Sequence, residues 1–165
     1  MQVQTTTHPV EIYTAHYTIG GLMEPIGNFA AYINDPIISA FRITDATLLP
    51  IMYRARLGEM KLPELYVMRS EIHVFLVGDF SPRDANLLPR RHALVCMTSA
   101  FAVRGVFYAG QEFREAQVFD PPGPFFPATN IDIYNLRTLM TEVNGSADLA
   151  FVNKMHISAY HPAAR

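Results

Sequence analysis

An internal repeat with a period of about 84 residues constrains the fold of this chain more than any other feature. Residues 14–23 align with residues 98–107, and apolar, aromatic and glycine positions follow one another in the same order. Residues 66–72 align with residues 151–157 after a slip of one position. The alternative is a chance similarity between two β-rich segments. We expect two tandem units related by internal duplication.

A middle block sharpens the alignment and the unit boundaries. Phe41 falls on Phe126, and Asp45 falls on Asn130. The first unit then spans residues 10–77 and the second unit spans residues 93–162. Residues 78–92 contain two prolines and mixed charges, which is typical of a linker along the surface.

The hydrophobic pattern within a unit is typical of short β-strands. Apolar residues alternate near the end of the first unit, and Gly21 interrupts an earlier alternation, which indicates a bulge or sharp bend. One short helical turn is expected at residues 29–34, capped by Asn28, and its counterpart at 112–118 reads as a short helix or a strand. The pattern predicts an all-β fold of two tandem, small, strongly bent β-barrels.

Several blocks resemble a known type of domain. They are Gly21, residues 27–34, residues 41–46 and residues 67–72. Together they resemble a short bacterial domain of unknown function that is similar to SH3-like or Sm-like barrels. The second unit keeps the first and last blocks but lacks the asparagine turn and the Asp-Ala pair. The resemblance implies a small barrel in each unit and supplies no catalytic residue.

Composition excludes several classes of protein. Half of the 165 residues are apolar and only 17% are charged, which excludes a disordered chain. No apolar run approaches the roughly 20 residues of a membrane-spanning helix. A net charge of −2 gives no basic surface for nucleic acid. We therefore expect neither a membrane span nor a nucleic-acid partner.

The N-terminus and the cysteine content indicate a compartment. Residues 1–9 are polar and threonine-rich, without the basic start and apolar stretch of a secretory signal. The single cysteine, Cys96, has no internal partner for a disulfide, and its apolar surroundings favour a buried thiol. We expect a cytoplasmic protein.

No pattern of polar residues indicates catalysis, a cofactor or a metal site. The histidines lack metal-ligand spacing; they are His8, His16, His73, His92, His156 and His161. Asp45 is the best candidate for an acid or base, but an aspartate that holds a turn is the more ordinary interpretation. An enzyme with a polar cluster around Asp45 and His16 is a weaker hypothesis, and we expect a protein without catalysis.

An adjacent aromatic pair suggests where copies of the chain could meet. Phe125 and Phe126 follow a segment rich in proline and glycine, which predicts a loop that projects from the sheet. The loop either folds back over the boundary between the units or inserts into a neighbouring chain. We take Phe125 and Phe126 as candidate contacts in a homo-oligomer.

Two functions remain at this point. Small barrels are marginally stable alone, and this chain has few charges to cover its surface, so we expect a structural or scaffold protein that self-assembles into a ring or filament. The alternative is a regulatory module that binds a small ligand, such as a nucleotide, through Arg83, Arg90 and Arg91.

Overall fold

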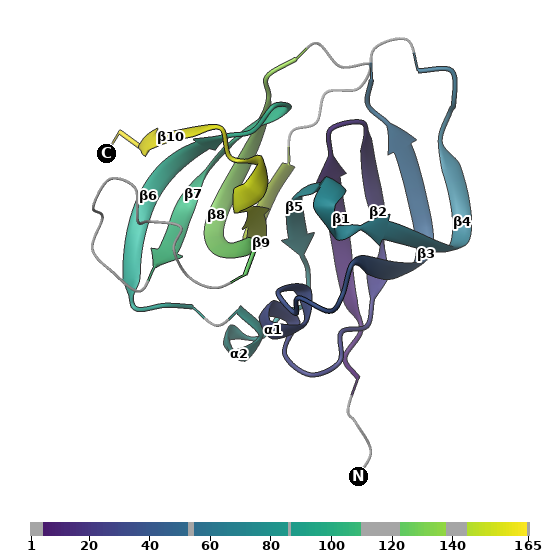
Figure 1. Ribbon diagram of the computed structural model, residues 1–165, viewed down its shortest axis with the longest axis horizontal. Helices are drawn as coiled ribbons and strands as arrows, with labels where there is room; N and C mark the ends of the chain where they lie inside the picture. Colours follow the sequence, from purple (N-terminus) through teal and green to yellow (C-terminus); the bar gives the residue numbers. More distant parts are fainter. Residues whose placement is uncertain (1–4, 53–54, 86, 110–122, 138–144, 165) are drawn as a thin grey trace.

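The computed structural model describes residues 5–52, 55–85, 87–109, 123–137 and 145–164 and is an all-β fold. Ten antiparallel strands form one sheet with the order β10-β6-β7-β8-β9-β5-β1-β2-β3-β4 (Figure 1). The first five are β1 (His8–Thr14), β2 (Tyr17–Met23), β3 (Ala40–Pro50), β4 (Met60–Met68) and β5 (Ile72–Val77). The others are β6 (Arg90–Met97), β7 (Phe101–Ala109), β8 (Phe125–Asn135), β9 (Gly145–Asn153) and β10 (Ala159–Pro162).

Helical structure in the described part of the chain is confined to short segments. The helix α1 (Phe29–Ile33) lies near α2 (Pro82–Ala85), below the middle strands of the sheet in the view of Figure 1. Asn28 caps α1, because its side-chain oxygen accepts a hydrogen bond from the Ala31 amide at 3.0 Å, which confirms the expected turn. The expected counterpart at 112–118 lies outside the described residues. No described helix is long and apolar enough to cross a membrane.

The two halves of the chain have the same strand order. In the first half the order is β5-β1-β2-β3-β4, and in the second half it is β10-β6-β7-β8-β9. The last strand of each half therefore lies beside the first. The halves meet where β5 pairs with β9, so the tenth and the fourth strands form the two ends of the sheet.

The pairing register also repeats. Val10 faces Val77 in the first half, and Leu94 faces Pro162 in the second, which are the positions 84 and 85 residues later. Each described pair between β1 and β2, β2 and β3, or β3 and β4 recurs between the corresponding strands of the second half. The residues that the sequence repeat aligned therefore occupy equivalent places in the sheet.

A glycine bends the second strand of each half. The β2–β3 register shifts around Gly21, and the β7–β8 register shifts around Gly105. A Cβ atom on Gly21 would lie only 2.8 Å from the carbonyl oxygen of Thr44, and one on Gly105 would overlap the Ile131 side chain. The absence of a side chain lets the neighbouring strand approach at the bulge, as the sequence predicted.

The sheet covers two separate hydrophobic cores, one for each half. We call them core 1 and core 2. Core 1 includes Ile12, Phe29, Phe41, Ile43, Phe75 and Phe151. Core 2 includes Leu94, Phe101, Val103, Phe107, Phe126 and Val152. The cores lie on opposite faces of the sheet, because adjacent residues of the paired central strands belong to different cores.

The junction between β5 and β9 is consequently buried on both faces. Phe75 and Phe151 are paired and point into core 1, whereas Val74 and Val152 are paired and point into core 2. All six residues of β5 and the last five of β9 are buried. Residues 74–77 and 149–152, which pair there, are apolar without alternation, as expected of strand segments buried on both faces.

We predict that Gly21→Ala destabilises the protein while Gly20→Ala does not. An added methyl group at Gly21 meets backbone and should lower the free energy of unfolding by about 1 to 3 kcal/mol. Gly20 has open space around its Cβ position, so its change should stay within about 0.5 kcal/mol. Urea unfolding measures both, and equal effects would contradict the account of the bulge.

Candidate functional site

The phenylalanine pair lies in the cores of its own chain. Phe125 and Phe126 begin β8 rather than forming a projecting loop, and they are 3% and 2% exposed. Strand alternation sends Phe125 into core 1, beside Phe41 and Phe75, and Phe126 into core 2. Both side chains are already covered, so a contact between chains has to be sought elsewhere.

Phe125 is held in the first half by hydrogen bonds as well as by packing. The Phe125 amide donates to Asn34 Oδ1 at 2.8 Å, and Asn34 Nδ2 donates to the Phe125 carbonyl at 3.2 Å. Asn153 adds a buried bond across the junction, from its Nδ2 to the Ile72 carbonyl at 2.9 Å. These side-chain hydrogen bonds add to the backbone pairing of β5 with β9 that joins the two halves.

The three arginines of the ligand hypothesis lie near the start of the second half. Arg83 is in α2, and its side chain lies outside what the structure describes. Arg90 and Arg91 are exposed at the beginning of β6. Arg91 extends over the ring of Tyr108 at 5.8 Å from the ring centre, where guanidinium and aromatic ring attract each other.

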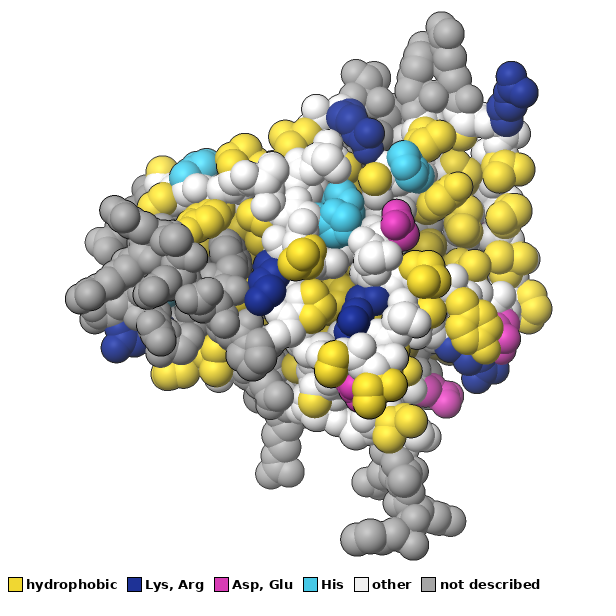
Figure 2. Space-filling view, in the orientation of Figure 1, with side chains coloured by type: hydrophobic (Ala, Val, Ile, Leu, Met, Phe, Trp, Pro, Cys, Tyr) yellow, Lys and Arg dark blue, Asp and Glu magenta, His cyan; other side chains and the backbone are white. Residues whose placement is uncertain are grey.

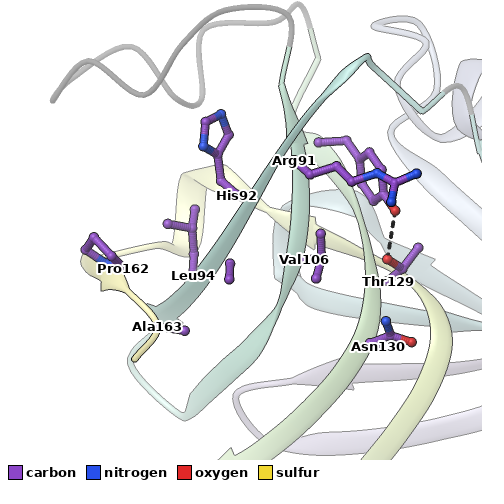
Figure 3. Close-up of a pocket in the computed structure, with 10 residues that line it drawn as sticks. Arg91, His92, Leu94, Val106, Thr129, Asn130, Pro162 and Ala163 are labelled. Atoms are coloured by element: carbon purple, nitrogen blue, oxygen red, sulfur yellow. Dashed lines mark hydrogen bonds between the residues drawn. The ribbon is translucent and has the colours of Figure 1, made fainter. Parts of the chain in front are cut away.

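Arg91 also lines a groove of about 560 Å³ on the sheet of the second half (Figure 3). Its lining includes the apolar residues Ala93, Val106 and Pro162. The Tyr108 hydroxyl lies 2.9 Å from Thr129 Oγ1. The groove lies beside β10, at one end of the sheet.

The two end strands offer a second candidate site. Among the described residues, β4 pairs with β3 and β10 pairs with β6, and no described strand pairs along the other edge of either. A free edge presents backbone N–H and C=O groups that another strand can pair with. We call these the β4 edge and the β10 edge.

Exposed apolar side chains lie on the β4 edge. Tyr66 is 59% exposed and Met68 is 51% exposed. The residues at equivalent places in the second half are Phe151 and Asn153, which are almost completely buried at the junction. Hydrophobic side chains also gather over the part of the molecule formed by β3 and β4, at the right of the view (Figure 2). β4 and β9 thus occupy equivalent places, but β9 is covered by β5 whereas the side chains at the β4 edge are exposed.

A pair of stacked histidines lies at one end of the junction. The rings of His73 and His156 are 4.1 Å apart, and His73 Nδ1 is 3.0 Å from Thr98 Oγ1. Burial, together with the electrostatic effect of nearby His156, Arg137 and His16, lowers the pKa of His73 to about 4. His73 is therefore neutral in the folded protein near pH 7.

The other residues considered for chemistry have structural surroundings. Asp45 adopts a φ of 48° within β3, and Asn130 adopts 52° at the equivalent place, so both lie at an irregularity of the strand. Cys96 is fully buried in core 2, and burial raises the pKa of its thiol to about 12. No group of three or more His, Cys, Asp or Glu side chains in the described part could hold a metal ion.

Comparison of the chain with protein-family models, with curated proteins and with solved structures gives no match.

The sequence did not indicate the β4 edge and the β10 edge as a candidate site. The repeat aligned Tyr66 with Phe151, but it did not show that one would be exposed and the other buried. A usable signal was the apolar run at residues 74–77, because a strand buried on both faces needs a partner on each side.

We predict a loss of stability on acidification that depends on His73. In the unfolded chain the His73 side chain takes up a proton near pH 6.5, whereas in the folded protein it does so near pH 4. The free energy of unfolding therefore falls as the pH drops between these values. At pH 4.5 the loss from this group is about 2 to 3 kcal/mol. Urea unfolding at pH 7 and pH 4.5 should show a smaller loss for His73→Gln.

Arg104→Ala, an exposed arginine of β7 away from both ends of the sheet, supplies the control for that experiment. It should keep the pH dependence of the unchanged protein. If His73→Gln retained the full loss of stability on acidification, the assignment of this titration to His73 would be wrong.

Proposed function

We propose that this protein is a non-enzymatic structural or scaffold protein whose copies assemble through the β4 edge of one chain and the β10 edge of the next. The observation that carries the proposal is the β5–β9 junction inside a single chain. It joins the last strand of one half to the fourth strand of the other. The two ends of the sheet are likewise a last strand, β10, and a fourth strand, β4.

The repeated register gives the expected contact between chains. At the junction Phe75 faces Phe151. The equivalent residues 85 positions away are Tyr160 and Tyr66, which we place opposite each other across two chains. The neighbouring pairs in this register are Ala159 with Val67, His161 with Leu65, and Pro162 with Glu64.

The backbone groups needed for this pairing face outward. The Ala163 amide donates to the Ala93 carbonyl at 2.9 Å, so alternation along β10 turns the backbone groups of Tyr160 and Pro162 away from β6. Tyr160 and Pro162 could together form three backbone hydrogen bonds with β4 of the next chain. A fourth is missing because Pro162 has no N–H. Pro63, which also lacks an N–H, lies just beyond the four expected pairs.

Side-chain burial supports the same register. At the junction, core 1 covers Phe151. By the same geometry, core 2 of one chain would cover Tyr66 of the next, and Glu64, the counterpart of Leu149, would lie on the same face. Burial of exposed aromatic and aliphatic surface is the main favourable contribution to such an interface. Tyr160 already packs at the border of core 2, where Tyr66 would arrive.

Head-to-tail contact extends the assembly beyond two copies. The two edges are different surfaces, so each added chain leaves one edge of each kind, and the assembly closes as a ring or grows as a filament. The repeated order and register support an origin by internal duplication, with units 10–77 and 93–162 joined by residues 78–92. We infer that each unit is a small barrel of the SH3-like or Sm-like type.

We predict that Tyr66→Glu breaks the assembly. Light scattering of the unchanged protein at tens of micromolar should give a multiple of 18.6 kDa, and the variant should give a folded monomer. A charge without a partner and a lost apolar contact at the strand edge oppose pairing. Tyr134→Glu is the matched control, since Tyr134 is 48% exposed on β8, away from both edges.

Tyr134→Glu should leave the mass of the assembly unchanged. A monomeric mass for the unchanged protein at the same concentration would rule out the proposed function. Assembly that survived Tyr66→Glu would place the contact on another surface.

A further inference from the structure

Two grooves share part of their lining in the repeated register of the two halves, although the part around Arg91 and Tyr108 has no counterpart in the first half's groove. The groove at the junction has a volume of about 400 Å³ and is lined by Val10 of β1 and by Val77 of β5. The groove beside β10 is lined by Leu94 and Pro162, the counterparts of those residues in the repeated register. We call them the junction groove and the edge groove.

The junction groove has a wall that the edge groove lacks. Ser146, Ala147 and Asp148 of β9 complete the junction groove. In the contact proposed above, β4 of the neighbouring chain takes the place of β9. The counterpart of Ser146 is Lys61, which is exposed, so the neighbouring chain would bring Lys61 to the edge groove.

The two grooves differ in charge. Carboxylates line the junction groove at Glu11, Asp79 and Asp148. The described lining of the edge groove contains Arg91 and His92 and no carboxylate. Lys61 of the neighbouring chain would add a second full positive charge. The completed edge groove would therefore attract an anion, whereas the junction groove would repel one.

Resting on the proposed assembly, we infer that the edge groove of one chain and Lys61 of the next form a binding site for the polyphosphate group of a nucleotide. Its volume of about 560 Å³ lies in the range of small-molecule sites. Arg91 presents a planar guanidinium that can form paired hydrogen bonds with phosphate oxygens. The Tyr108 and Thr129 hydroxyl groups lie beneath it (Figure 3).

A ligand held by both chains would also strengthen their contact. Binding to the assembled form alone shifts the equilibrium toward assembly by mass action. The site thus gives the scaffold a means of regulation by nucleotide concentration. The apolar side chains of Ala93 and Val106 in the groove offer a surface for the uncharged part of the ligand.

Calorimetric titration with ATP, tripolyphosphate and adenosine tests this site. ATP should bind the assembled protein, and adenosine should not. Arg91→Ala and Lys61→Ala should each weaken ATP binding about tenfold or more, since each removes a charged hydrogen-bond donor. Arg104→Ala, an exposed arginine of β7 outside the groove, should bind ATP like the unchanged protein.

Comparison of ATP with tripolyphosphate distinguishes a nucleotide from free polyphosphate as the ligand. Equal binding of ATP and tripolyphosphate supports a site for free polyphosphate, and preference for ATP supports a nucleotide site. Equal binding of ATP and adenosine, or unchanged binding by Arg91→Ala, would overturn the inference.

Light scattering of the same samples separates failure of the site from failure of the assembly. An assembled protein that binds neither phosphate compound disproves the ligand site alone. A protein that stays monomeric, with or without ATP, disproves the assembly and the shared site together. Tyr66→Glu should remain folded and monomeric and bind ATP as weakly as Lys61→Ala.

Discussion

The pairing of β5 with β9 determines the rest of the structure. It joins two five-stranded halves into one sheet and leaves each half free to curl around its own core on an opposite face. The paired residues at this junction are apolar, because each lies against one core or the other. Phe125 and Asn34 reinforce the junction with packing and hydrogen bonds. The free strands at the two ends of the sheet follow from the same arrangement.

Local sequence signals predicted the local structure well. Gly21 and Gly105 marked the bulges, and Asn28 marked the start of α1. These features depend on backbone geometry and close contacts within one segment, so nearby residues encode them. The sequence also predicted an all-β chain, because short alternating runs separated by proline and glycine leave little room for helices.

Long-range features could not be predicted in the same way. Phe125 and Phe126 were expected in a projecting loop, but each lies in a different core because the partner strands arrive from distant parts of the chain. The exposure of Tyr66 also depends on where the sheet ends, which the sequence of β4 alone does not state. Arg91 was singled out as one of two adjacent arginines, yet the groove beside it is built by strands β6, β7, β8 and β10.

Disulfide trapping tests the proposed register most directly. His161→Cys and Leu65→Cys would face each other across two chains with Cα atoms about 4.5 Å apart, within the range of a disulfide. Mild oxidation should therefore link chains of the double variant into covalent multimers, while buried Cys96 stays unreactive. His161→Cys with Lys61→Cys, four residues out of register, should remain unlinked. Equal linking of both double variants, or of neither, would contradict the account that copies meet as the two halves of one chain do.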